Sequence, residues 1–171
     1  MYKNLREYIE RLEREGELVR VAAPVSTRFE IAEITDRMVK SEGGGKALLF
    51  ENTGTEFPVV TNMMGSKRRM AMALGVERLE EIGQRISALL GDALSPKATL
   101  WEKMKMLPLL SDVAKWFPQR VAGRGECQQV VWQGEDADLE RLPLLTSWES
   151  DGGAFVTLPM VNTRLISAPA I

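Results

Sequence analysis

The residues with the clearest potential for chemistry lie near the end of the chain, in the stretch 142–164. Two carboxylates, Glu149 and Asp151, precede the pair Gly152–Gly153, and Thr157 follows shortly after. Neighbouring carboxylates are the groups that acid–base catalysis and oxygen-seeking metal ions use. The glycine pair also permits a tight turn, and the alternating apolar residues after it favour a strand. An exposed turn entering a sheet explains the carboxylates better than a catalytic or metal site, so we assign no catalytic or metal residue here.

A second candidate is the cationic run Lys67, Arg68 and Arg69, which follows the turn Gly65–Ser66 and opens a predicted helix. Helix N-termini favour anions, so cations at this place indicate a nearby phosphate or carboxylate. Two interpretations stay open: a functional contact with an anion, and surface salt bridges to acidic residues. The second is favoured, and nucleotide binding does not follow because the P-loop pattern is lacking. The acidic partners expected are Glu77, Glu80 and Glu81.

The composition argues against several classes of protein. The chain contains no histidine, which is the commonest general base and nitrogen ligand for metals. The single cysteine, Cys127, excludes an internal disulfide, indicates a reducing compartment and has no histidine to activate it as a nucleophile. The formal charge of −2 gives no general attraction to nucleic acid. No apolar run approaches the ~20 residues of a membrane span, and the charged N-terminus does not resemble a signal peptide, so we predict a cytoplasmic protein.

Two helices are predicted near the N-terminus from caps and apolar spacing. Asn4 caps the first, which begins at Leu5 and ends at Gly16. Thr27 is the predicted cap of the second, and the glycines at 43–45 stop it.

Three short strands are predicted between and after these helices, at 18–21, 47–50 and 57–61. The second is wholly apolar, which is typical of a strand covered on both faces. The strand–helix–strand order predicts an α+β protein whose N-terminal domain is a mixed-sheet α/β domain.

The character of the chain changes near residue 125. Before this point, apolar spacing predicts a helix at 79–90 that Gly91 closes, and after it the run 127–132 reads as a strand. We therefore predict two domains, 1–125 and 126–171, the second with too few strands to fold independently.

Several motifs resemble the UbiD family of decarboxylases, enzymes that use prenylated FMN. The segment from Trp148 to Thr163 is similar to the family pattern W-x-x-D-G-G-x-F-x-T-x-P-x-V-x-T, and the resemblance runs in order from residue 1 to about 164. Earlier segments that resemble the family are Leu5-Arg6-Glu7-Tyr8-Ile9, Gly16-Glu17-Leu18, Glu33-Ile34-Thr35-Asp36-Arg37, Pro58-Val59-Val60-Thr61-Asn62 and Gly65-Ser66.

This resemblance implies a fold, a cofactor and a site residue. The second domain would begin a split β-barrel, similar to flavin reductases, that holds prenylated FMN through a divalent metal (Mn or Mg) and potassium. Thr157 matches a family threonine on the strand that enters the cofactor site, so it is the expected cofactor-binding residue. Trp148 and the Asp151–Gly153 turn match the segment before it, where a structural role is expected.

The resemblance also limits what this chain is expected to do. No residue here matches the family's metal-ligand asparagine or its Glu-Arg-Glu catalytic network, and 165–171 does not resemble the family. We therefore expect the N-terminal part of a decarboxylase of aromatic or α,β-unsaturated carboxylic acids, in a family that includes enzymes of quinone biosynthesis. The chain alone is expected to be inactive and not to hold the flavin.

Two other functions stay open. The chain could be a non-catalytic binding or assembly module that covers a flavin site completed by other residues, or a flavin reductase-like protein that binds ordinary FMN. An incomplete barrel exposes strand edges and apolar surface, so we predict a homo-oligomer.

Overall fold

The computed structural model describes residues 2–94, 111, 114, 117–118 and 122–156. The chain divides into two compact units, one containing Met1–Gly75 with Leu139–Ile171 and the other Val76–Asp138. The later part of the chain therefore folds with the first part, across a long insertion. The predicted domain limits 1–125 and 126–171 stay a prediction.

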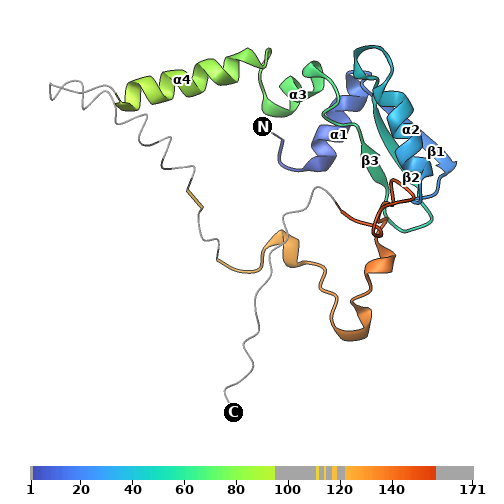
Figure 1. Cartoon of the computed structure of the whole chain (residues 1–171). Coiled ribbons are helices and arrows are strands. Elements are labelled where there is room, and N and C mark those ends of the chain that lie inside the picture. The colour runs from blue at the N-terminus through green and yellow to red at the C-terminus, as the bar shows by residue number, and fades with distance from the viewer. Residues whose placement is uncertain (1, 95–110, 112–113, 115–116, 119–121, 157–171) are drawn as a thin grey trace. The chain divides into compact units, whose positions relative to one another are not determined.

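The first unit is built on a three-stranded mixed sheet in the order β1-β2-β3 (Figure 1). β1 (Leu18–Pro24) and β2 (Ala47–Asn52) are parallel, and β3 (Val59–Thr61) is antiparallel to β2. A helix connects β1 to β2, as a parallel pair requires. The predicted α+β class is confirmed.

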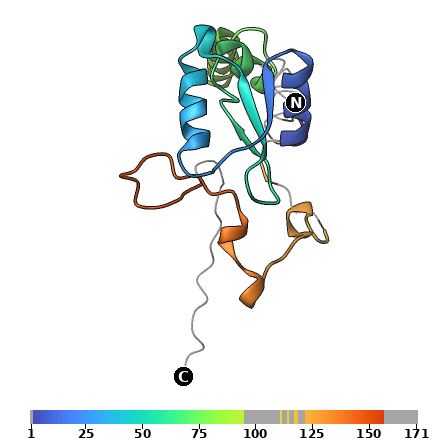
Figure 2. The same ribbon diagram turned by 90° about the vertical axis from the view of Figure 1, so that its right-hand side faces the viewer.

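Helices cover both faces of the central strand, as its apolar sequence predicts. α1 (Leu5–Arg14) and α2 (Glu30–Val39) lie on opposite sides of the sheet (Figure 2). On the α2 side, the buried core is formed by Val25, Ile31, Leu48 and Phe50. On the α1 side it is formed by Tyr8, Leu12 and Ala47, with residues of α3 (Lys67–Leu74) packed against it.

The two predicted helix starts have different outcomes. Asn4 caps α1, and its side chain accepts a hydrogen bond from the Glu7 amide at 3.0 Å. Thr27 does not cap α2, so that prediction is wrong. The N-cap is Phe29, which has φ +70° and makes no side-chain capping bond.

The second unit contains α4 (Glu80–Leu94), which continues past Gly91 instead of ending there. A glycine inside a helix lowers its stability but does not stop it. The strand predicted at 127–132 is also wrong, since Glu126–Gln128 forms a short 3-10 helix and no strand follows it among the described residues. Of the helices in the described part of the chain, none has the length and apolar character needed to cross a membrane.

Candidate functional site

The segment that carries the predicted site residues is docked onto the first unit by backbone hydrogen bonds. The Phe29 amide donates to the Thr146 carbonyl at 2.9 Å, and the Thr146 amide donates to the Thr27 carbonyl at 3.2 Å. These bonds form a parallel bridge between Arg28 and Thr146. Leu145, next to this bridge, packs against the buried cluster on the α2 side of the sheet. The segment is thus tied to the N-terminal sheet by both polar and apolar contacts.

Asp151 closes the turn that the glycine pair predicts. Its Oδ2 atom accepts hydrogen bonds from the Ser147 and Trp148 amides, each at 2.9 Å. Gly153 has φ +145°, and beyond it the Phe155 amide donates to the Leu145 carbonyl at 3.1 Å. A side-chain carboxylate that holds two amides fixes a turn. The turn expected at this place is therefore present, and the Asp151 carboxylate bonds to its own backbone.

Thr157, the expected cofactor-binding residue, lies outside the described residues, two positions after Phe155. Within the described ranges, no group of three or more His, Cys, Asp or Glu side chains is placed to hold a metal ion. Glu149 is exposed beside the turn. We assign the described residues no step of flavin chemistry.

A small hollow lies where the turn meets the start of α2. Its volume is about 280 Å³, and Phe29 and Trp148 line it on opposite sides of the junction, with Glu33 and Glu149 nearby. Trp148 is 64% exposed, whereas Glu33 pairs with Arg37 at 2.7 Å. The Arg28 guanidinium lies over the Phe29 ring at 5.0 Å. The hollow therefore marks an aromatic surface at the docking point instead of an enclosed catalytic cavity.

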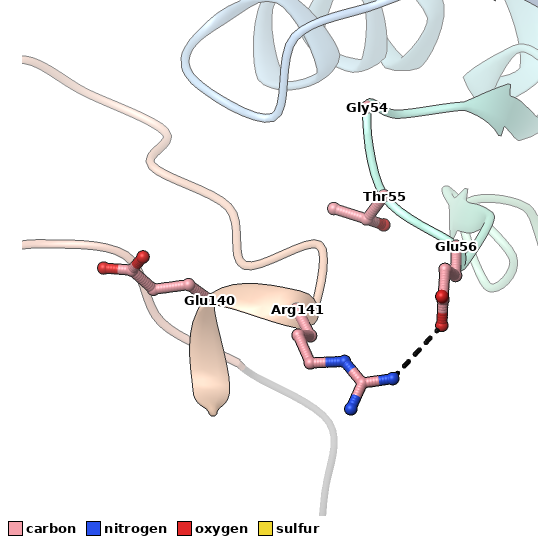
Figure 3. A pocket seen from close by; sticks show the side chains of 5 residues that line it. All are labelled: Gly54, Thr55, Glu56, Glu140 and Arg141. Carbon is pink, nitrogen blue, oxygen red and sulfur yellow. Dashed lines mark hydrogen bonds and ion pairs between the residues drawn. The ribbon is translucent and has the colours of Figure 1, made fainter. Parts of the chain in front are cut away.

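A second contact joins the same segment to the loop between β2 and β3 (Figure 3). Arg141, in the 3-10 helix Leu139–Arg141, lies 3.5 Å from a carboxylate oxygen of Glu56. The pocket here has a volume of about 320 Å³ and is lined by Gly54, Thr55, Glu56, Glu140 and Arg141. Both charges are exposed, so the pair adds little stability but marks where the segment lies.

The cationic run of α3 has a different environment from the predicted one. Arg68 pairs with Glu15 and Glu17 at 2.8 and 2.7 Å, and Arg69 pairs with Glu17 at 3.0 Å. The Arg69 side chain is fully buried, whereas Lys67 is exposed. The anion near this helix start is thus the protein's own Glu17.

The prediction that these cations form salt bridges with Glu77, Glu80 or Glu81 is therefore wrong. Glu80 pairs with Arg78 at 3.4 Å, and Glu81 pairs with Arg85 at 3.3 Å and accepts hydrogen bonds from the Glu77 and Arg78 amides. These carboxylates are thus bound by residues close to them in the chain, at and just before the start of α4.

Arg69 also holds the glycine run in place. Its Nη1 atom donates to the Gly45 carbonyl at 2.5 Å and its Nη2 atom to the Gly44 carbonyl at 3.3 Å. Gly44 has φ +83°, and a Cβ there would collide with the Gly65 carbonyl oxygen. The Arg69 Nε atom has no hydrogen-bond partner in the described structure. Glycine is thus required by close backbone approach, and the arginine satisfies the carbonyls that this approach buries.

Tyr8 completes the cluster from the α1 side. Its hydroxyl donates to the Arg69 carbonyl at 2.8 Å and lies 3.2 Å from the Met63 carbonyl. Burial, reinforced by Tyr2 and Glu17, raises the pKa of Tyr8 above its usual 10.0, although Arg69 opposes the shift. This cluster links α1, α3 and the glycine run through buried polar contacts.

The last sequence candidate, Cys127, lies in the 3-10 helix of the second unit. Sequence analysis missed Phe29, Thr146 and Glu17, which carry the docking and the buried ion pair. Thr146 and Glu17 have no local signature, because their partners lie far away in the chain. The failure of Thr27 as a cap has its cause in the unusual backbone at Phe29.

The chain is similar in structure to solved decarboxylases. It is similar to vanillic acid decarboxylase of Sedimentibacter hydroxybenzoicus in its closed form, with a TM-score of 0.62 and 28% identity, over 90% of this chain and 29% of that chain. An evolved dimeric form of the UbiD-class enzyme HmfF from Pelotomaculum thermopropionicum, in complex with prFMN, is 33% identical over 52% of this chain and 20% of that one, with a TM-score of 0.44.

Sequence comparison then gives the family. Residues 9–86 match the 3-octaprenyl-4-hydroxybenzoate carboxy-lyase N-terminal domain, and residues 119–168 match the Rift-related domain of the same carboxy-lyase. The chain belongs to the UbiD family and corresponds to an N-terminal portion of its members. An uncharacterised protein of Aquifex aeolicus is 46% identical over 164 residues, which are 95% of this chain and 33% of that relative. The chain therefore spans about a third of the length of this relative.

Proposed function

We propose that this chain forms the N-terminal scaffold of a UbiD-type decarboxylase and positions the first segment of its cofactor site. The whole enzyme would use prenylated FMN with a divalent metal and potassium, and would act on an aromatic or α,β-unsaturated carboxylic acid. The observation that carries the proposal is the docking of Leu145 and Thr146 on the N-terminal sheet. This docking belongs to the segment that leads to Thr157, the residue proposed to line the flavin site, and family membership supplies the activity.

The role proposed for this chain is positioning, and the chemistry is left to the cofactor and to residues outside the described ones. Cofactors carry the difficult chemistry in such enzymes, and the protein supplies orientation and electrostatics. No residue of 1–171 matches the family's metal-ligand asparagine or its Glu-Arg-Glu network. We therefore propose that the 171-residue chain alone neither decarboxylates nor retains prenylated FMN.

A chimera tests the proposal. Residues 1–164 would replace the matching third of the Aquifex aeolicus relative, and retention of prenylated FMN with Mn²⁺ and K⁺ would be measured by absorbance after gel filtration. We expect the chimera to retain the flavin. The substitution Thr157→Val, which keeps the shape of the side chain and removes its hydroxyl, should weaken this retention. Serine at the same position is the matched control and should preserve it. A folded chimera that retains no flavin would refute the scaffold role.

A second function, an assembly module, is favoured by the apolar side chains that the chain exposes. Large exposed apolar patches mark interaction surfaces, and each of the two units exposes apolar side chains. Light scattering after size exclusion should show a homo-oligomer of the 19.1 kDa chain, and a strictly monomeric chain would count against assembly. The exposed side chains concerned are Val130, Val131, Leu139, Trp148, Phe155 and Val156.

A further inference from the structure

Phe29 has a backbone conformation that an aromatic residue rarely adopts. Its φ and ψ angles are +70° and −41°. The Glu30 amide donates to the Arg28 carbonyl at 2.9 Å, which closes a three-residue γ-turn with Phe29 at its centre. The positive-φ form of this turn is the rare and strained one, and a side chain with a Cβ makes it worse. Such strain persists only where surrounding structure enforces it, and it clusters at functional places.

The hydrogen bonds around Phe29 show what enforces the turn. On one side, the Phe29 carbonyl accepts from the Glu33 amide at 2.8 Å, which begins α2. On the other side, the Phe29 amide donates to the Thr146 carbonyl at 2.9 Å, and the Thr146 amide returns a bond to Thr27. The Glu30 carboxylate further holds the turn by accepting from the Ser26 amide at 2.7 Å. The strained residue thus lies between the helix and the docked segment and bonds to both.

A relaxed turn would lose this arrangement. Rotation of Phe29 to negative φ would redirect its amide while the following carbonyl stays fixed in the first turn of α2. The bond to Thr146 would then break, and with it the only bridge between the docked segment and residues 26–29 among those described. A strand that slips by one residue turns every side chain to its other face. The γ-turn therefore selects one register for the segment at 145–156.

We propose that Phe29 is a positioning residue whose strained backbone sets the register of segment 145–156. This segment precedes Thr157, whose role rests on the function proposed above, whereas the register of the segment does not. The effect runs through the backbone at position 29, and the ring is secondary. A comparison of alanine with glycine at this position isolates the backbone contribution, because both residues lack the ring and they differ only in the Cβ.

The experiment is amide hydrogen exchange of the full 171-residue chain by NMR, comparing Phe29→Ala with Phe29→Gly. At positive φ a Cβ is unfavourable, so the Thr146 and Phe155 amides should be protected about 5- to 30-fold more in the glycine variant. In ordinary helical backbone the preference is reversed. The matched control is therefore Ala32→Gly in α2, which should lower the protection of neighbouring α2 amides.

The same spectra report the register directly. A nuclear Overhauser effect between the amide of residue 29 and Thr146 should persist in both variants, because alanine keeps the Cβ that phenylalanine has and glycine adopts positive φ without a steric cost. Higher protection in the alanine variant, or equal protection in both, would overturn the proposal, and so would loss of the contact in the glycine variant. No flavin enters this experiment, so its failure leaves the proposed function untouched. Conversely, a chimera that retains no flavin would leave the register argument intact.

Discussion

Replacing the buried Arg69 by methionine should destabilise the first unit strongly, although Arg68 beside it should tolerate the same change. The Arg69 side chain is 0% exposed and the Arg68 side chain 57% exposed, yet both pair with Glu17. Arg69→Met would leave Glu17, itself only 17% exposed, beside an apolar chain. It would also remove one hydrogen-bond donor from each of the Gly44 and Gly45 carbonyls.

The magnitude follows from the difference in burial. Removing one partner of a buried ion pair costs about 3–5 kcal/mol when the other charge is left unpaired. Glu17 keeps its pair with Arg68 at 2.7 Å, so we expect a loss at the lower end of this range. An exposed pair is worth about 0–1 kcal/mol, so Arg68→Met should lie in that range. The two variants share a helix, a partner and a replacement residue, and they differ in solvent exposure and in the two carbonyl bonds that the Arg69 side chain makes. The comparison therefore measures the contribution of burial together with that of these two bonds.

The assay is urea unfolding followed by hydrogen exchange of the β2 amides, which are central to the first unit. Adding Glu17→Met to Arg69→Met should recover part of the loss, since apolar replacement of a whole buried pair is often neutral. Equal losses for Arg68→Met and Arg69→Met would refute the reasoning. A further loss in the double variant would show that Glu17 is solvated without Arg69.

Two further predictions concern Tyr8 and Asp151. Because burial raises the pKa of Tyr8, the folded state keeps a proton that the unfolded state releases, so this contribution is complete below about pH 10 and is lost as the pH rises further. Tyr8→Phe should lower the free energy of unfolding by about 1 kcal/mol near neutral pH. The difference in urea midpoint between this variant and the native chain should shrink at alkaline pH, and a difference that stays constant would contradict the raised pKa of Tyr8. Asp151→Ala should accelerate exchange of the Ser147 and Trp148 amides about tenfold, with partial rescue by Asp151→Asn and no change in Glu149→Gln. Unchanged exchange in Asp151→Ala would show that the turn does not depend on the carboxylate.

The parts of the fold that sequence analysis predicted correctly depend on short-range rules. Asn4 satisfies an amide three residues away, and the apolar run in β2 needs only to be covered on both faces. The Asp151 turn is equally local, since its carboxylate bonds to amides three and four residues before it. In each case the residues that decide the structure are neighbours in the chain.

The predictions that failed depend on contacts between distant residues. Arg68 and Arg69 find Glu15 and Glu17 some fifty positions away, because α1 and α3 pack on the same face of the sheet. The run 127–132 has β-prone residues, but no strand pairs with it among the described residues, and propensity without a partner does not make a strand. Thr27 has the composition of a cap, yet its carbonyl accepts a hydrogen bond from the distant Thr146 amide, and α2 begins at Glu30 after the N-cap Phe29.

These contacts also explain why the segment at 139–156 belongs with the N-terminal sheet. Its own β-type pairing is one bridge, between Leu145 and Phe155, and a single pairing is too little to hold a hairpin in water. Its other fixed points are the bridge at Arg28, the packing of Leu145 and the ion pair of Arg141, and all three partners lie in residues 1–75. The conformation of this segment is therefore a property of the sheet that receives it. A substitution at Phe29, more than a hundred positions earlier in the sequence, should consequently change the conformation of this segment more than a substitution at the exposed Glu149 within it.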